Sequence, residues 1–194
     1  MSHVRAARLC LLLALLLSPW HEVAAYNGSD VSALHLGGPV QLTDHHGHRR
    51  SLADFHGKVV LLFFGYTRCP DVCPVTLSRL ARVMKLLGSD AGRVQVLWVT
   101  VDPARDTQKL LSSYVPAFNP AFLGLRGNDR ETVAVASQFR IQYAITRFKG
   151  EILVDHTSSG FLIDPNGQAR LKLGYDLTAE QIAADVRAVL SVKP

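Results

Sequence analysis

Two predominantly apolar runs, residues 59–66 and 94–101, dominate the hydrophobic pattern of the chain. Runs of this length without polar alternation are typical of strands that are buried on both faces of a sheet. Between them, apolar residues recur at helical spacing, namely at Leu77, Leu80, Ala81, Met84 and Leu87. Gly88 then follows as a helix stop. Strand, helix and strand in close succession predict a βαβ unit with two parallel strands.

The pattern outside this unit predicts three more helices, a short strand and two hairpins. The helices are expected at 107–115, at 130–139 and after the capping box Thr178–Gln181, and the short strand at 121–125. The hairpins are expected at 159–173, around the turn Asp164-Pro165-Asn166-Gly167, and at 40–52, around residues 44–48. Together these elements predict an α/β domain with a central mixed sheet, helices on both faces and an N-terminal β-hairpin extension.

The first 25 residues have the features of a targeting segment. Arg5 and Arg8 precede the apolar run 9–17, and small residues at 23–25 offer a cleavage site. This run is shorter than a membrane span requires, so we predict a signal peptide over 1–25, with a short N-terminal anchor as the alternative. A leader is expected at 26–39 and the folded domain at 40–194. The protein is therefore expected to be exported, periplasmic or membrane-associated on the non-cytoplasmic side.

Composition narrows the function classes. The formal net charge of +5 is spread along the chain without a basic block, so binding to nucleic acid is not indicated. Three cysteines are too few for a disulfide scaffold, so any thiol chemistry is local. Cleavage after Ala25 would remove Cys10 and leave Cys69 and Cys73, a pair that an exported protein must oxidise, protect with a metal or keep reduced through a partner.

The cysteine pair lies between the first buried strand and the helix of the βαβ unit, at the sheet edge where α/β proteins bind ligands. We expect that helix to begin at Pro74, with Cys73 as its cap residue and 69–72 as an exposed loop. Both sulfurs would then face the positive helix end, which favours thiolates. The spacing permits a structural disulfide or a shared metal, and two soft thiolates select Cu(I) before Zn(II).

A histidine is expected as the third ligand. His156 comes shortly before the strand 160–163, and if that strand is antiparallel to 59–66, His156 lies near both cysteines. The turn residues His45, His46 and His48 are expected to point outward, either as a solvated cluster or as an auxiliary metal site. Asp102 is interpreted as a loop cap or as an orienting group, and Asp71 and Asp155 as orienting groups or solvated turn residues.

Four motifs in order resemble the Sco (SenC/PrrC) family of copper proteins. They are FGYTxCPDVCP at 64–74, VDPxRDT at 101–107, DHT at 155–157 and FLIDPNG at 161–167. The resemblance covers roughly residues 36–192 and implies a thioredoxin-like fold. It also implies a copper site formed by Cys69, Cys73 and His156, holding Cu(I) or Cu(II), and a role in assembling the dinuclear copper centre of cytochrome c oxidase. The implied partners are the copper-accepting oxidase subunit and another copper chaperone or a thioredoxin-like reductant.

Three other functions compete with a copper chaperone. In a thiol–disulfide oxidoreductase, Cys69 would attack and Cys73 would resolve, but the three-residue spacer and the lack of a proline in 157–160 favour metal binding. A peroxidase of the peroxiredoxin kind needs a hydroxyl and a proline placed differently from Thr67 and Pro70. A copper or redox sensor has no distinguishing feature in the sequence. We therefore expect a metallochaperone rather than an enzyme.

Overall fold

The computed structural model describes residues 25–39, 41–148 and 151–192, with side chains throughout these ranges except at 147, 148, 151–153 and 156. Eight of the described strands form one sheet in the order β1-β10-β9-β4-β5-β6-β2-β3. In chain order they are β1 (Ser29–Asp30), β2 (Leu42–Asp44), β3 (Arg49–Arg50), β4 (Val59–Gly65), β5 (Val94–Thr100), β6 (Leu123–Arg126), β9 (Gly160–Ile163) and β10 (Ala169–Leu173). A separate two-stranded sheet consists of β7 (Tyr143–Phe148) and β8 (Glu151–His156).

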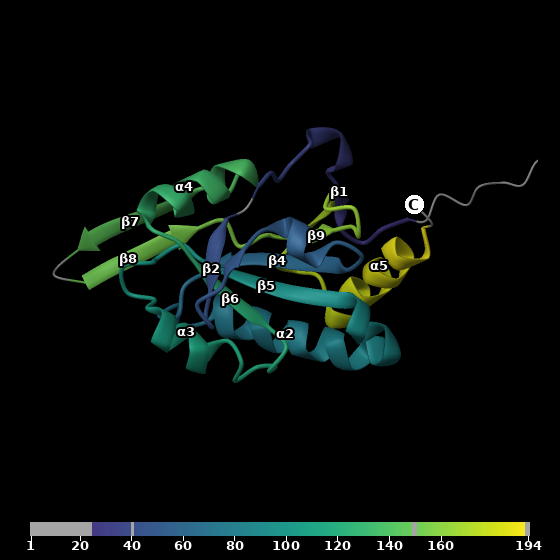
Figure 1. The fold of residues 1–194 in the computed structure, drawn as a ribbon, viewed down its shortest axis with the longest axis horizontal. Helices are drawn as coiled ribbons and strands as arrows, with labels where there is room; N and C mark the ends of the chain where they lie inside the picture. Colours follow the sequence, from purple (N-terminus) through teal and green to yellow (C-terminus); the bar gives the residue numbers. More distant parts are fainter. Residues whose placement is uncertain (1–24, 40, 149–150, 193–194) are drawn as a thin grey trace, which may run out of the picture.

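The predicted βαβ unit forms the centre of the sheet. β4 and β5 are parallel over their full length, and β6 continues the parallel arrangement beside β5. β9 pairs antiparallel with the other side of β4, and the hairpin β2–β3 extends the opposite edge beyond β6. The sheet is therefore mixed, with the expected N-terminal hairpin at one edge (Figure 1).

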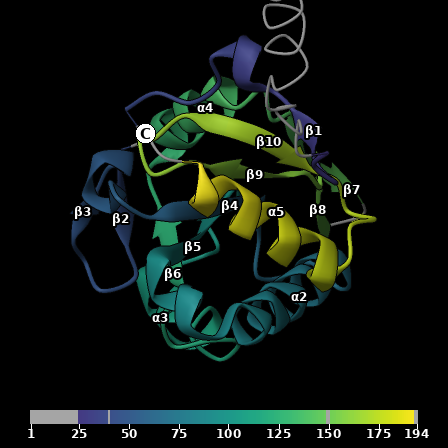
Figure 2. The ribbon, with the colours of Figure 1, turned by 90° about the vertical axis from the view of Figure 1, so that its right-hand side faces the viewer.

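In the described part of the chain, four α-helices cover the two faces of the sheet: α2 (Val72–Leu87), α3 (Gln108–Tyr114), α4 (Asp129–Gln138) and α5 (Ala179–Ser191). Alternate residues of β4 enter two different cores. Leu61 and Phe63 pack with side chains of α2, α3 and α5, whereas Leu62 and Phe64 pack with α4 and with a 3-10 helix at Leu52–Phe55. Figure 2 shows α4 on the side of the sheet opposite α2 and α3. The predicted helices on both faces are confirmed.

Both predicted hairpin turns form, and they share one hydrogen-bond pattern. In the Asp44 turn the carboxylate accepts from the backbone N–H groups of His46 and His48, each at 2.9 Å. In the Asp164 turn it accepts from those of Asn166 and Gln168, also at 2.9 Å. A glycine closes each turn with a positive φ, +94° at Gly47 and +82° at Gly167.

The helix α2 begins at Val72, two residues before the expected start at Pro74. Pro74 is tolerated because the first four N–H groups of a helix have no partner inside it, so the missing donor removes no hydrogen bond. The carbonyl one turn earlier belongs to Pro70, outside the helix, which removes the clash that our prediction was meant to avoid. Cys73 is consequently a residue of the first helical turn and not its cap.

The residues expected to form a loose leader are instead attached to the domain. β1 pairs antiparallel with β10, and Asp185 of α5 accepts hydrogen bonds from three donors of the preceding segment. These donors are the backbone N–H and side-chain amide of Asn27, at 2.8 and 2.9 Å, and the backbone N–H of Gly28 at 2.8 Å. The prediction failed because the partner is 158 residues away and nothing local indicates it.

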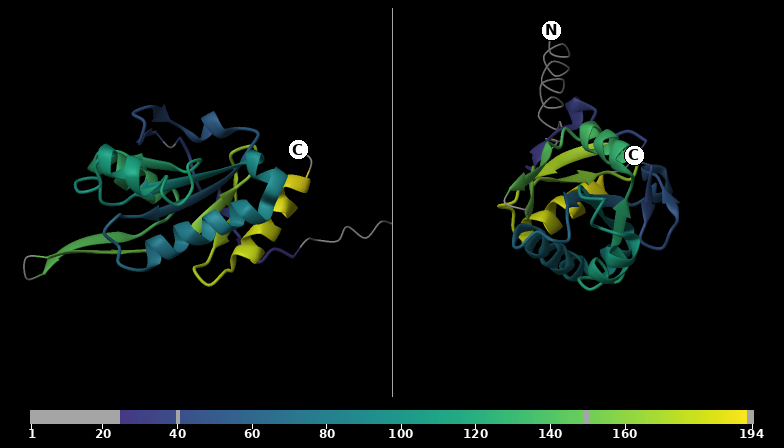
Figure 3. Two further views of the ribbon diagram at one scale, coloured as in Figure 1. Left: turned by 90° about the horizontal axis from the view of Figure 1, so that it is seen from below. Right: turned by 90° about the vertical axis from the view of Figure 1, so that its left-hand side faces the viewer.

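The hairpin β7–β8 was not predicted. It projects from the body of the molecule as a long two-stranded ribbon (Figure 3), with Tyr143 paired to His156 at its base. Two runs of mixed apolar and polar residues separated by Lys149-Gly150 were the available sequence signal. Among the described residues, no helix combines the length and apolar character that crossing a membrane requires.

Candidate metal centre

The two cysteines lie where β4 ends and α2 begins. Gly65 is the last residue of β4, Cys69 is half-buried in the following loop, and Cys73 is 3% exposed. We call this region, with the segment 66–73 and the adjacent loop 101–106, the cysteine edge. The prediction placed Cys69 in an exposed loop and Cys73 at the helix cap. Cys69 lies in a loop but is half-buried, and the early start of α2 places Cys73 in the core.

The two sulfurs are thiols, not a disulfide, and the backbone links them. The N–H of Cys73 is one of the donors at the start of α2 that have no acceptor within the helix, and it donates to Cys69 Sγ at 3.4 Å. The N–H of Cys69 in turn donates to the carbonyl of Tyr66 at 3.3 Å. The predicted interaction of a sulfur with the helix amino end is therefore present, and Cys69 is the residue that makes it.

Burial raises the pKa of the Cys73 thiol to about 12, although hydrogen bonding with the Tyr66 backbone opposes this shift. The expectation that the helix end makes Cys73 a thiolate is therefore wrong, because removal from water outweighs the helix dipole. Burial and the nearby cysteines also raise the pKa of Tyr66, and raise that of Tyr114 to about 12. The Tyr114 hydroxyl is buried and has no hydrogen-bond partner among the described residues.

Close packing leaves little free space around Cys73. A Cβ at Gly65 would lie 2.8 Å from Cys73 Sγ and 2.9 Å from Trp98 Nε1, so only glycine fits the end of β4. A small pocket here is lined by Phe63, Phe64, Val72, Cys73, Thr76, Trp98 and Ser158. Ser158 belongs to the segment between β8 and β9, so this segment reaches the buried thiol.

His156 ends β8, two residues before Ser158. The strand pairing assumed in its prediction is present, because β9 is antiparallel to β4 and Gly160 is opposite Phe63. The start of β9 therefore lies at the end of β4 that carries the cysteines. The side chain of His156 lies outside the described part of the structure, so its role as a ligand stays a prediction.

A buried carboxylate that sequence reasoning passed over connects the cysteine loop to the sheet. Asp106 is fully buried and accepts from the hydroxyl and N–H of Thr67, at 2.5 and 3.1 Å, and from the hydroxyl of Thr100 at 2.6 Å. Nearby, Asp102 forms an ion pair with Arg105, and its carbonyl accepts from the N–H groups of Arg105 and Asp106. The loop-capping interpretation of Asp102 is thus the one that the structure supports.

The comparison with protein families matches residues 29–191 to the SCO1/SenC family. The chain belongs to the SCO1/SenC family. It is 37% identical over 153 residues to protein sco1 of Schizosaccharomyces pombe, an alignment that covers 76% of this chain and 58% of that protein. It is 32% identical to an SCO2-like protein of Rickettsia prowazekii, covering 76% of this chain and 73% of the relative.

Solved structures agree with this family assignment. ScoI of Bradyrhizobium japonicum, solved with copper bound, matches with a TM-score of 0.74 and 36% identity over 79% of this chain and 99% of its own. BsSco, a matched structure with 22% identity to this chain, is a member of the Sco family of cytochrome c oxidase assembly proteins. The thioredoxin-like fold expected from the motifs is confirmed, and the copper-bound relative agrees with the metal that we expected for the family.

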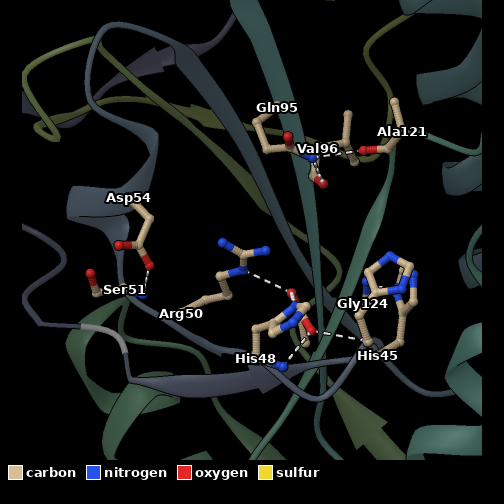
Figure 4. A network of polar contacts seen from close by, with 11 residues as sticks. His45, His48, Arg50, Ser51, Asp54, Gln95, Val96, Ala121 and Gly124 are labelled. Atoms are coloured by element: carbon tan, nitrogen blue, oxygen red, sulfur yellow. Dashed lines mark hydrogen bonds and ion pairs between the residues drawn. The ribbon is translucent and has the colours of Figure 1, made fainter.

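The histidine turn of this SCO1/SenC protein differs from its prediction. His45 is only 4% exposed, and its Nδ1 accepts from the N–H of Gly124 at 3.0 Å (Figure 4). The expected outward orientation is therefore wrong for His45, because the turn packs against β6. Within the described side chains, no group of three or more His, Cys, Asp or Glu residues could hold a metal ion, so the auxiliary site is not formed there.

Proposed function

We propose that this SCO1/SenC protein is an exported metallochaperone that carries one Cu(I) ion on Cys69, Cys73 and His156. The observation that carries the proposal is the pair of adjacent thiols at the cysteine edge, where the N–H of Cys73 reaches Cys69 Sγ. Two sulfur ligands and one imidazole suit the monovalent ion, and the copper-bound relative from Bradyrhizobium japonicum supports the choice of metal.

The asymmetry of the thiols suggests an order of events. Cys69 is the accessible sulfur and the first to meet incoming Cu(I), whereas Cys73 must lose its proton as the ion binds. Release to an acceptor begins at the same accessible sulfur: a thiolate of the acceptor replaces Cys69, and Cys73 then takes up a proton as it is displaced. The acceptor that fits the family is the copper-accepting subunit of cytochrome c oxidase. We place this exchange in the periplasm or at the non-cytoplasmic side of a membrane.

Anaerobic titration of the reduced protein with Cu(I) tests the proposal. We expect one tightly bound ion per chain, little binding by the disulfide form, and loss of that ion in Cys69→Ser and Cys73→Ser. His156→Ala should weaken binding by at least tenfold. His56→Ala is the matched control, because His56 lies beside Gly167 at the other end of the sheet and should leave binding unchanged. Unchanged copper stoichiometry in Cys69→Ser would overturn the proposal.

A second function, thiol–disulfide exchange on the acceptor, is favoured by the half-buried Cys69 beside the buried Cys73. The Cys69 thiolate would attack the acceptor disulfide and release one acceptor thiolate. The Cys73 thiolate would then attack Cys69 and release the second, leaving this pair oxidised and the acceptor reduced by two electrons. A thioredoxin-like dithiol would restore the pair. Turnover with a disulfide substrate by protein free of copper, lost in Cys73→Ser, would establish this function over copper delivery.

A further inference from the structure

The attachment of the cysteine loop to the sheet depends on one buried side chain. Asp106 has no exposed surface, and its two carboxylate oxygens contact two segments that meet at the cysteine edge. One oxygen accepts from the Thr67 hydroxyl, and the other accepts from the Thr67 N–H and from the hydroxyl of Thr100, the last residue of β5. Thr67 precedes Cys69 by two residues, so Asp106 restrains the backbone just before the accessible thiol.

A buried carboxylate is stable only when donors replace the water that it has lost. The three bonds to Asp106 satisfy this need, and they also fix the direction in which the chain leaves β4. The turn from Tyr66 to Cys69 follows at once, closed by the hydrogen bond from the Cys69 N–H to the Tyr66 carbonyl. Cys69 Sγ is then placed over the first turn of α2, within reach of the Cys73 N–H.

We propose that Asp106 is a positioning residue that keeps the two sulfurs together before any metal arrives, and so raises both copper affinity and the tendency of the pair to form a disulfide. The copper part rests on the function proposed above, whereas the disulfide part concerns the metal-free protein alone. The physical reason is common to both. Two sulfurs that are already held close together lose less conformational entropy when they bind a metal or form a disulfide.

Asp185 provides a matched control, because its substitution shows the effect of losing a buried carboxylate that has only a structural role. It too is a buried carboxylate, 2% exposed, and it accepts three hydrogen bonds, here from Asn27 and Gly28. Its donors belong to the amino-terminal segment and not to the cysteine edge. Asp106→Asn and Asp185→Asn should therefore both reduce resistance to urea, but only Asp106→Asn should change the properties of the cysteine pair.

The experiment compares these two variants in Cu(I) affinity, by competition with a chelator, and in the disulfide equilibrium of metal-free protein against glutathione. For Asp106→Asn we expect Cu(I) affinity to fall at least tenfold. We also expect the equilibrium constant for disulfide formation to fall about tenfold, equivalent to a reduction potential about 30 mV more positive. Asp185→Asn should stay within twofold of wild type in both measurements. Equal behaviour of the two variants would refute the proposal.

Thr67 supplies a second pair of variants if Asp106→Asn does not fold. Thr67→Ser keeps the hydroxyl that Asp106 accepts from and should retain wild-type values, whereas Thr67→Val removes it and should shift both measurements in the direction of Asp106→Asn. A wild-type protein that binds no Cu(I) would overturn the proposed function, but the disulfide equilibrium would still test Asp106. Thr67→Val with an unchanged disulfide equilibrium would contradict the positioning role.

Discussion

The Asp164 turn and the cysteine edge lie at opposite ends of the central strands, and each is organised by a buried aspartate. Asp164 accepts from backbone groups two and four residues along the chain. Asp106 instead accepts from Thr100 and from Thr67, the latter 39 residues away. The turn is therefore a local structure that four or five residues specify, whereas the cysteine edge exists only when separate segments have already assembled.

This difference implies that changes at the two ends have different consequences. A substitution at the turn affects its own few hydrogen bonds. At the cysteine edge, Gly65, Cys73, Trp98 and Ser158 share one closely packed region, so a small change in any of them reaches the thiol. Three measurements test this difference between the Asp164 turn and the cysteine edge.

The largest expected effect is the slow alkylation of Cys73 in the native protein. With a pKa of about 12, its thiolate fraction near pH 8 is roughly 10⁻⁴, against about 10⁻¹ for an ordinary thiol. Iodoacetamide should therefore modify Cys73 about a thousandfold more slowly in the folded protein than in urea, measured by mass spectrometry of cysteine peptides. Equal rates in the folded and unfolded protein would show that the Cys73 thiol is accessible to the reagent, which would contradict the close packing of the cysteine edge.

Glycine substitutions at the two ends give the next largest effect. A Cβ at Gly160, where β9 begins, would lie closer than 3.0 Å to the Phe63 ring, whereas at Gly167 the nearest atom is His56 Nε2 at 3.3 Å. Gly160→Ala should destabilise the protein by about 2–3 kcal/mol through overpacking in the core. Gly167→Ala should lose about 1 kcal/mol through its positive φ. Urea unfolding measures both losses, and the opposite ranking would contradict the packing argument.

The smallest expected effect is the pH dependence of stability that the buried His45 gives to the Asp44 turn. Burial lowers the pKa of His45, and His46 adds to this shift while Asp44 opposes it. The unfolded chain therefore takes up this proton at higher pH than the folded protein, so the stability contribution is present above the unfolded pKa near 6.5 and is lost as pH falls below it. Between pH 7.5 and 5.5 the wild type should lose more resistance to urea than His45→Asn. Equal losses of resistance to urea in the two proteins would exclude His45 as the source of the pH dependence.

The sequence predicted those parts of the fold whose determining residues are close together along the chain. The turn at Asp164 and the capping box at Thr178 depend on residues within four positions, and the buried strand β4 is evident from its unbroken apolar run. Cys69 and Cys73 stand out by spacing alone. In contrast, Asp106, Asp185 and the burial of His45 depend on partners 39, 158 and 79 residues away. No local pattern can indicate such partners, because assembly creates them.

The contact between Asp185 and the amino-terminal segment also fixes where this segment lies on the domain. Tyr26 lines a pocket with Pro165 of the Asp164 turn and with Val189 and Val192 near the carboxyl end of α5. Tyr26 thus lies on the side of the domain remote from the sulfurs. A force applied to the chain at Tyr26 would therefore act on α5 and the Asp164 turn and would leave the two thiols unstrained.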